Sequence, residues 1–307
     1  MLHDNGLLKY YKDYADEKGR LKTYQAFGDG EYSTSSLNIK LFYISNGEVA
    51  KKYFEKFLIY NASYGVYSEL VQSQVFKDNG LNTAIYTPSI TKSGTECVIS
   101  DNISTPNNVK MVEFIDKAIL KGNIQCSPYS NSTETTPEKI QYEKIFTKSA
   151  MKKFILGHAL DVAGGNNDRH PQNFEVQVGK SEEGLDIIED IFYYDYGETT
   201  FAYPQKKENS FYFKNGLGYG MNKNKNSMIA MFRNCPHILE YYQPNELAEI
   251  LGNVDIREIA RDFKEEINFS IGEEYLDSAE RSYFNVAQGL VKGVREDGII
   301  QDLISGN

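Results

Sequence analysis

The sequence is poor in the residues that build several common kinds of site. It has no tryptophan, only four histidines and only three cysteines among 307 residues. Cys97, Cys126 and Cys235 lie far apart and form no C-x-x-C pair, so neither a zinc ribbon nor a disulfide framework is indicated. A histidine-based metal site lacks supporting ligand spacing as well. A reducing compartment is therefore expected.

Long apolar runs are also missing. No stretch approaches the roughly 18 apolar residues that a membrane span needs, so no transmembrane helix is expected. The N-terminal segment has no basic region followed by an apolar one, as a secretory signal would. We expect a cytoplasmic protein, with signal-less export as an effector left open. The net charge of −10, from 33 basic and 43 acidic residues, argues against general binding of nucleic acid or anionic membrane.

What the chain does contain is typical of a folded, soluble protein. Hydrophobic residues make up 40% and charged residues 25%, and 23 tyrosines with 17 phenylalanines supply an aromatic core. The length fits one or two packed units, or one two-lobed domain.

The first 105 residues carry the patterns of a β-rich unit. Asn46-Gly47 is the strongest short hairpin signal, because both residues tolerate the positive φ angles of a type I′ turn. Helical spacing of apolar residues predicts a helix over residues 64–79, which Gly80 would end in a left-handed conformation. Strands are predicted over residues 21–27, 37–44, 49–54, 84–90 and 96–100.

The remainder is polar at first and then mostly helical. Residues 106–136 are predicted to form a hinge and a polar linker, and Thr136-Pro137 signals a helix that runs to about Ala163, with a break near Ser149. Further helices are predicted over residues 246–251, 256–267 and 278–294. These features predict an α+β fold with two lobes, a small β-rich N-lobe at residues 1–105 and a mainly helical C-lobe at residues 137–307.

Two polar motifs in the second half carry the chemistry. They are Asp168-Arg169-His170-Pro171-Gln172-Asn173 and Asp195-Tyr196-Gly197. Phosphoryl transfer needs a carboxylate near the attacking hydroxyl and oxygen ligands for Mg²⁺, and Asp168 and Asn173 have the D-x-x-x-x-N spacing of a kinase catalytic loop. Asp195-Tyr196-Gly197 matches the metal-binding Asp-Phe-Gly with one aromatic residue exchanged. Strands at 174–178 and 187–194 would form a hairpin that returns Asp195 beside Asn173.

Asp-Arg-His-x-x-Asn followed by Asp-aromatic-Gly resembles the phosphatidylinositol kinases and the HipA-like bacterial serine/threonine kinases, a group that includes the cell-translocating kinase CtkA. Gly165-Asn166-x-Asp168 looks most like the HipA-like branch. The resemblance implies a protein-kinase-like fold and ATP- and Mg²⁺-dependent transfer to serine or threonine of a protein, with autophosphorylation. It also implies that Asp168 orients or deprotonates the hydroxyl, that Asn173 and Asp195 hold Mg²⁺, and that His170 orients the loop.

The N-terminal third contains a candidate nucleotide lysine. Kinases place a phosphate-binding lysine on their third strand. Val49-Ala50-Lys51-Lys52 lies on the third predicted strand, directly after the Asn-Gly hairpin. Lys52 is the expected residue because it would share a strand face with Ala50, and Lys51 is the alternative. Glu69, on the predicted helix, is expected to pair with this lysine; Tyr67-Ser68-Glu69 also looks like the corresponding helix of CtkA.

Three further features have both a functional and a plain structural interpretation. Gly28 and Gly30 supply two of the three glycines of G-x-G-x-x-G, so phosphate contact and an ordinary turn are equally expected. His158 is expected to be a packed core residue. Residues 201–227 would form the activation segment; their excess of lysines suits a solvated loop or the docking of an acidic or phosphorylated substrate.

Two other functions fit the same motifs. A lipid or small-molecule kinase would share the loop. A nucleotide-binding pseudokinase or a toxin–antitoxin interaction module would keep the fold without transfer, although every expected catalytic position holds the right type of residue. The physiological substrate and the oligomeric state are left open.

Overall fold

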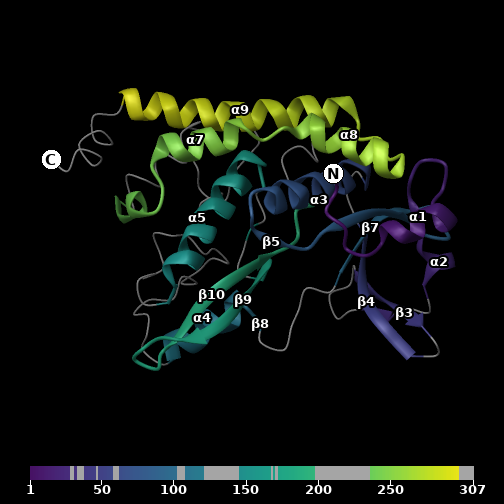
Figure 1. Ribbon diagram of the computed structural model, residues 1–307, viewed down its shortest axis with the longest axis horizontal. Helices are drawn as coiled ribbons and strands as arrows, with labels where there is room; N and C mark the ends of the chain where they lie inside the picture. Colours follow the sequence, from purple (N-terminus) through teal and green to yellow (C-terminus); the bar gives the residue numbers. More distant parts are fainter. Residues whose placement is uncertain are drawn as a thin grey trace. The chain divides into compact units, whose positions relative to one another are not determined.

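Figure 1 shows the helices and strands of the computed structural model. The chain divides into two compact units. The structure describes residues 1–27, 31–32, 38–45, 48–57, 62–101, 108–120, 145–166, 169, 172–197 and 236–296. The first unit contains the described residues of 1–103 together with 196–197 and 255–278, and the second contains those of 104–195, 236–254 and 279–296. Each unit combines strands with helices, which confirms the α+β class.

A six-stranded sheet organises the first unit. Its order is β1-β6-β7-β4-β3-β2, in which β1 runs parallel to β6 and the other neighbours are antiparallel. Ser45 at the end of β3 pairs with Glu48 at the start of β4, which confirms the hairpin predicted around Asn46-Gly47, although these two residues themselves lie outside the described part. The strands are β1 (Leu21–Lys22), β2 (Glu31–Tyr32), β3 (Asn38–Ser45), β4 (Glu48–Phe57), β6 (Tyr86–Ile90) and β7 (Glu96–Asp101).

Strand β4 contacts a layer of residues on each face of the sheet, because successive side chains of a strand point to opposite faces. Tyr53 packs into a cluster with residues of the N-terminal segment, where α1 (Leu8–Tyr14) and α2 (Thr23–Ala26) lie. Glu55, on the same face, accepts a hydrogen bond of 2.6 Å from the Thr23 hydroxyl. Lys56 has the opposite orientation and meets helix α3 (Ala62–Asp78).

Helix α3 is enclosed by the sheet and by a segment from much later in the chain. It packs on β6 and β7, and α8 (Ile256–Ile267) contacts it as well. The Tyr67 ring lies 6.1 Å from that of Phe269 and 5.7 Å from that of Tyr275, and Tyr64 donates a 2.6 Å hydrogen bond to Glu274. Gly80 has φ 75°, the left-handed conformation predicted at the end of this helix, and the short strand β5 (Asn82–Thr83) follows.

The second unit is built around an antiparallel hairpin with helices against it. Strand β9 (Phe174–Lys180) pairs with β10 (Asp186–Tyr193) on one side and with β8 (Asn108–Lys110) on the other, which confirms the predicted hairpin. Helix α4 (Met111–Leu120) packs on β8 and β9, and α5 (Lys148–Ala163) packs on β10. A Cβ atom on Gly157 would lie 2.5 Å from the Tyr193 ring, so only glycine permits this close approach of helix and strand.

The C-terminal helices complete the description. They are η5 (Pro236–Glu240, a 3₁₀ turn), α7 (Pro244–Gly252), α8 and α9 (Glu273–Glu296). Helix α7 packs on α5, and Ser282 of α9 donates a 2.7 Å hydrogen bond to the carbonyl of Ala163. The helix predicted over 256–267 is confirmed at both ends, and α7 and α9 extend the other two predictions. None of the helices that the structure describes has the length and apolarity of a membrane span.

Four expectations from the sequence differ from the structure. The strand predicted over residues 21–27 ends at Lys22, and Thr23–Ala26 forms a helical turn. The linker predicted over 106–136 contains β8 and α4. In the described part of the predicted helix 137–163, residues 145–147 are not helical, and α5 begins at Lys148, close to the break predicted near Ser149; Thr147 accepts a hydrogen bond there from the Ala150 N–H. Residues 255–278 were expected in the C-lobe but belong to the first unit.

Candidate functional site

The predicted site residues that the structure describes are divided between the two units. Lys52 and Glu69 belong to the first unit, and Asn173 and Asp195 belong to the second. The unit boundary falls at the bond between Asp195 and Tyr196, inside the Asp-Tyr-Gly motif. Other predicted residues lie outside the described part, namely Gly28, Gly30, Asp168, His170 and the segment 201–227.

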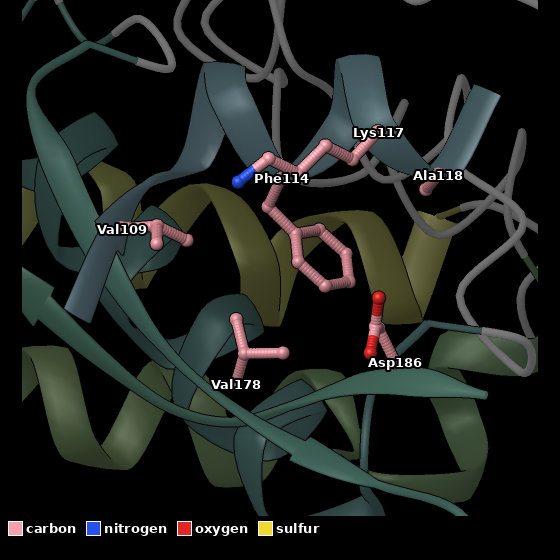
Figure 2. A pocket seen from close by; sticks show the side chains of 6 residues that line it. All are labelled: Val109, Phe114, Lys117, Ala118, Val178 and Asp186. Atoms are coloured by element: carbon pink, nitrogen blue, oxygen red, sulfur yellow. The ribbon is translucent and has the colours of Figure 1, made fainter. Parts of the chain in front are cut away.

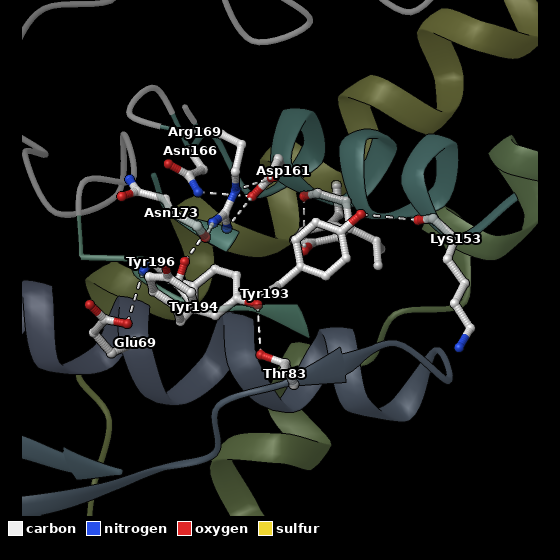
Figure 3. A network of polar contacts seen from close by, with 12 residues as sticks. Glu69, Thr83, Lys153, Asp161, Asn166, Arg169, Asn173, Tyr193, Tyr194 and Tyr196 are labelled. Carbon is white, nitrogen blue, oxygen red and sulfur yellow. Dashed lines mark hydrogen bonds and ion pairs between the residues drawn. The ribbon is translucent and has the colours of Figure 1, made fainter. Parts of the chain in front are cut away.

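Glu69 is a buried carboxylate with two separate partners in the first unit. Its side chain is 0% exposed, and Oε1 lies 2.5 Å from Lys56 Nζ. Oε2 accepts a hydrogen bond of 2.9 Å from the backbone N–H of Tyr196 (Figure 3). Because a charge without a partner is strongly disfavoured away from water, this carboxylate favours a conformation in which lysine and Tyr196 are both in place.

The lysine that the structure places beside Glu69 is Lys56, whereas the sequence analysis expected Lys52 in that position. Lys51, Lys52 and Lys56 all lie on β4, but Lys51 has the other orientation and forms a 3.0 Å ion pair with Asp101. Lys52 shares a face with Lys56, lies near the middle of the strand and is exposed. The strand continues three residues beyond its predicted end, and four residues of strand move a side chain by about 13 Å on the same face.

Tyr196 is fixed in the first unit by its ring, its hydroxyl and its backbone. The side chain is 0% exposed, with its ring centroid 4.9 Å from that of Phe76 and 6.4 Å from that of Tyr86. The hydroxyl lies 2.7 Å from the Thr83 hydroxyl, and both groups are buried (Figure 3). Together with the bond to Glu69, these contacts hold the residue that directly follows Asp195.

In the second unit, Arg169 of the Asp-Arg-His motif forms a buried network. Its guanidinium binds both carboxylate oxygens of Asp161, at 2.8 and 3.1 Å, and Asn166 donates to the same carboxylate at 2.8 Å (Figure 3). Asp161 is 2% and Arg169 is 6% exposed. Asp161 lies on α5 and was not recognised in the sequence, because nothing distinguishes a buried acidic residue of a helix from an exposed one before its partner is known.

The Arg169 network joins the two loops that carry the predicted metal ligands. Arg169 donates to the carbonyl of Asn173 at 2.7 Å and to that of Tyr194 at 2.5 Å. The Tyr194 N–H donates to the same Asn173 carbonyl at 3.4 Å, one residue before Asp195. The predicted return of Asp195 to the same end of the hairpin as Asn173 thus agrees with the backbone contacts of the second unit.

The donors at this end of the hairpin suit Mg²⁺. Asn173 and Asp195 offer an amide and a carboxylate oxygen, the hard donors that this ion prefers. Within the described residues, no group of three or more His, Cys, Asp or Glu side chains forms a denser metal site. Mg²⁺ usually takes only one or two protein ligands and completes its shell with phosphates and water, so a sparse donor set fits it.

Lys110 adds a positive charge to this group and was not recognised in the sequence. Its Nζ lies 4.3 Å from the centroid of the Tyr194 ring, contacts the Tyr194 hydroxyl and forms a 3.8 Å ion pair with Glu175. Desolvation lowers the pKa of Lys110, while the carboxylates of Glu175 and Asp195 raise it. Lys110 falls in the region predicted as polar linker, where no sequence signal set it apart.

His158 and the cavity of the second unit contribute no predicted site residue. His158 is 5% exposed on α5, and burial lowers its pKa well below the ordinary value, which confirms it as a packed, neutral core residue. A cavity of about 120 Å³ lies between α4 and the hairpin, where Phe114 points toward its centre (Figure 2). The residues that line it are Val109, Phe114, Lys117, Ala118, Val178 and Asp186.

Comparison with known proteins gives structural similarity without sequence similarity. No protein-family model matches the chain, and no curated protein matches it. The match to the crystal structure of the Helicobacter pylori proinflammatory kinase CtkA covers 86% of this chain and 94% of the CtkA chain, with a TM-score of 0.45 and 17% sequence identity. HipA, in the Shewanella oneidensis MR-1 toxin–antitoxin complex with HipB and operator DNA, has the same TM-score and 12% identity, over 91% of this chain and 68% of its own.

The buried network predicts a large loss of stability when one member is neutralised. Asp161→Asn is expected to lower the free energy of unfolding by about 3 kcal/mol or more, because the buried Arg169 charge loses its counter-charge. Asp190→Asn is the matched control: Asp190 pairs with Lys153 at 2.7 Å, but both side chains are more than 20% exposed, so about 1 kcal/mol or less is expected. Urea unfolding measures both variants, and equal losses would contradict this role of Asp161.

Proposed function

We propose that the protein is an ATP- and Mg²⁺-dependent phosphotransferase that phosphorylates serine or threonine residues of a protein. The observation that carries the proposal is the buried Glu69 carboxylate, which binds a strand lysine through one oxygen and the residue after Asp195 through the other. Protein kinases require a strand lysine paired with a helix glutamate, and an Asp-Phe-Gly aspartate that holds the metal.

The candidate residues would divide the work of such a reaction, with Asp168 assigned from the sequence motif alone. Lys56 positions the phosphates of ATP, and Glu69 holds Lys56 in place. Asn173 and Asp195 hold Mg²⁺, which supplies neutralisation of the charge on the transferred phosphoryl group. Asp168 orients the acceptor hydroxyl and accepts its proton.

A protein acceptor is favoured over a membrane lipid by charge. The net charge of −10 opposes approach to an anionic lipid surface, where basic clusters normally provide attraction. The lysines of residues 201–227 could offset this locally, so the assay below includes a lipid acceptor.

The experiment is phosphate transfer from γ-labelled ATP with Mg²⁺, followed by mass spectrometry of the products. Label on serine or threonine of the protein itself, or of an added protein, is the expected result. Label on phosphatidylinositol in vesicles, with none on protein, would instead identify a lipid kinase. Binding of nucleotide without transfer to any acceptor would identify a pseudokinase.

Two lysines of the same strand face provide a matched test of the site. Lys56→Ala is expected to lower transfer at least tenfold, because the phosphates lose a positioning charge, whereas Lys52→Ala should leave it within about threefold. Lys56→Arg keeps a charge for Glu69 and serves as the variant that separates misfolding from loss of function. Its expected result is a wild-type unfolding temperature with reduced transfer. If Lys52→Ala showed the larger loss, the original assignment to Lys52 would be correct.

A further inference from the structure

The tyrosine of the Asp-Tyr-Gly motif differs from the usual phenylalanine by one hydroxyl group, and that hydroxyl is not exposed to water. It lies 2.7 Å from the hydroxyl of Thr83 in the interior of the first unit. Tyr196 is 0% and Thr83 is 8% exposed. The Thr83 hydroxyl also donates to the carbonyl of Ala84 at 3.2 Å, which leaves its oxygen to accept from the Tyr196 hydroxyl. Because a buried hydroxyl without a partner is costly, this contact favours the one position of the ring in which the Tyr196 hydroxyl is satisfied.

The residue before Tyr196 has an uncommon backbone conformation. Asp195 has φ 66°, in the left-handed region that residues other than glycine rarely adopt. A residue persists in such a conformation when its surroundings determine it strongly. Those surroundings include the backbone bond from Tyr196 to Glu69 and the side-chain bond from Tyr196 to Thr83.

We infer that Thr83 and the Tyr196 hydroxyl form a latch that holds Asp195 in the orientation in which it binds Mg²⁺. Thr83 and Tyr196 are positioning residues that act through the peptide bond between Tyr196 and Asp195. The role of the latch in Mg²⁺ binding rests on the proposed phosphotransferase function. The latch itself rests on the structure alone.

Loss of the latch should lower the population of the metal-competent conformation. The apparent affinity for a ligand falls in proportion to the fraction of protein that can bind it. A hydrogen bond of ordinary net strength corresponds to a change of about fivefold in such an equilibrium. Saturating Mg²⁺ restores the competent conformation, so the maximal rate should change little.

The test compares Tyr196→Phe, Thr83→Val and the double variant with wild type. Each single variant is expected to raise the Mg²⁺ concentration for half-maximal transfer about fivefold, with the maximal rate within twofold. The double variant should be no worse than the more affected single variant, because both substitutions remove the same bond. Tyr11→Phe is the matched control, since it deletes a tyrosine hydroxyl that donates to the Pro88 carbonyl at 3.2 Å in the N-terminal layer, and its Mg²⁺ requirement should equal that of wild type.

A second measurement does not depend on activity. Hydrogen exchange at the Tyr196 amide, in protein without metal or nucleotide, should be about fivefold faster in Tyr196→Phe and Thr83→Val than in wild type and Tyr11→Phe. Unchanged exchange would overturn the latch. Faster exchange with an unchanged Mg²⁺ requirement would show that the hydroxyl pair only stabilises the fold, which also overturns the inference. If wild type transferred no phosphate, the proposed function would fail, and the exchange rates would still decide whether the latch exists.

Discussion

Asp195→Asn is expected to lower phosphoryl transfer by about 10²-fold or more, since electrostatic stabilisation of the transferring group supplies much of the catalysis. The substitution keeps the size of the side chain and one oxygen, and it removes the formal charge that Mg²⁺ prefers. Asp195 lies at the end of the hairpin where the Arg169 network holds the Tyr194 carbonyl, so its backbone should stay in place. Transfer should be measured over a range of Mg²⁺ concentrations, with a raised Mg²⁺ requirement as the second expected sign.

Asp190→Asn provides the control for this experiment. It makes the same chemical change five residues upstream, in β10, at an aspartate that pairs with Lys153. Its transfer rate and Mg²⁺ requirement should stay close to those of wild type. Unchanged transfer in Asp195→Asn would mean that Asp195 is not a metal ligand and that the assignment of the Asp-Tyr-Gly motif is wrong.

Asp168→Ala is expected to lower transfer by about 10²-fold or more while ATP·Mg²⁺ binding stays within a few-fold of wild type. Asp168 is five residues before Asn173, at the position of the catalytic-loop aspartate that faces the acceptor hydroxyl. A group used mainly in the transition state affects turnover more than the binding of the ground state. Calorimetry of ATP·Mg²⁺ binding, combined with the transfer assay, separates these two effects.

Asp168→Asn is the conservative companion of this variant. It keeps an oxygen that can orient the hydroxyl but cannot accept its proton at neutral pH, so a similar loss in both variants indicates a role as general base. A much smaller loss in Asp168→Asn would indicate orientation alone. Loss of nucleotide binding in a folded Asp168→Ala protein would place Asp168 in the nucleotide site and would contradict the catalytic assignment.

Elements with strong local signals could be predicted from the sequence. Helix α8 matches its predicted bounds because an amphipathic pattern lies between two clear ends: Asp255 caps its first turn, and Asn268 takes a left-handed conformation after its last. The β3–β4 hairpin and the β9–β10 hairpin are similarly local. Helix α4 was missed, although Met111–Leu120 has apolar residues at helical spacing, because the polar residues on both sides dominated the interpretation.

The motifs of the site were visible in the sequence, but their partners were not. The acidic residue on α3 was found by its place in a helix. Lys56, which contacts it, was not considered because the predicted strand ended at Phe54 and β4 continues to Phe57. Asp161 and Thr83 take their places in the site through contacts with Arg169 and Tyr196, and no motif in the sequence marks either contact. Pairing of this kind depends on tertiary packing, which a single sequence does not reveal.

The return of residues 255–278 to the first unit has a consequence for synthesis of the protein on the ribosome. Tyr64 of α3 donates a hydrogen bond to Glu274 at the start of α9, and the two residues are 210 positions apart in the chain. At roughly 5–20 residues per second, the ribosome needs about 10–40 s to make the chain between them. During that time the side of α3 that carries Tyr67 lacks Phe269 and Tyr275, the aromatic residues that later pack against it. The nascent sheet and α3 therefore form an intermediate whose exposed aromatic surface favours aggregation, and protection by a chaperone is most useful at this stage. Residues 1–105 expressed alone should keep this surface exposed permanently.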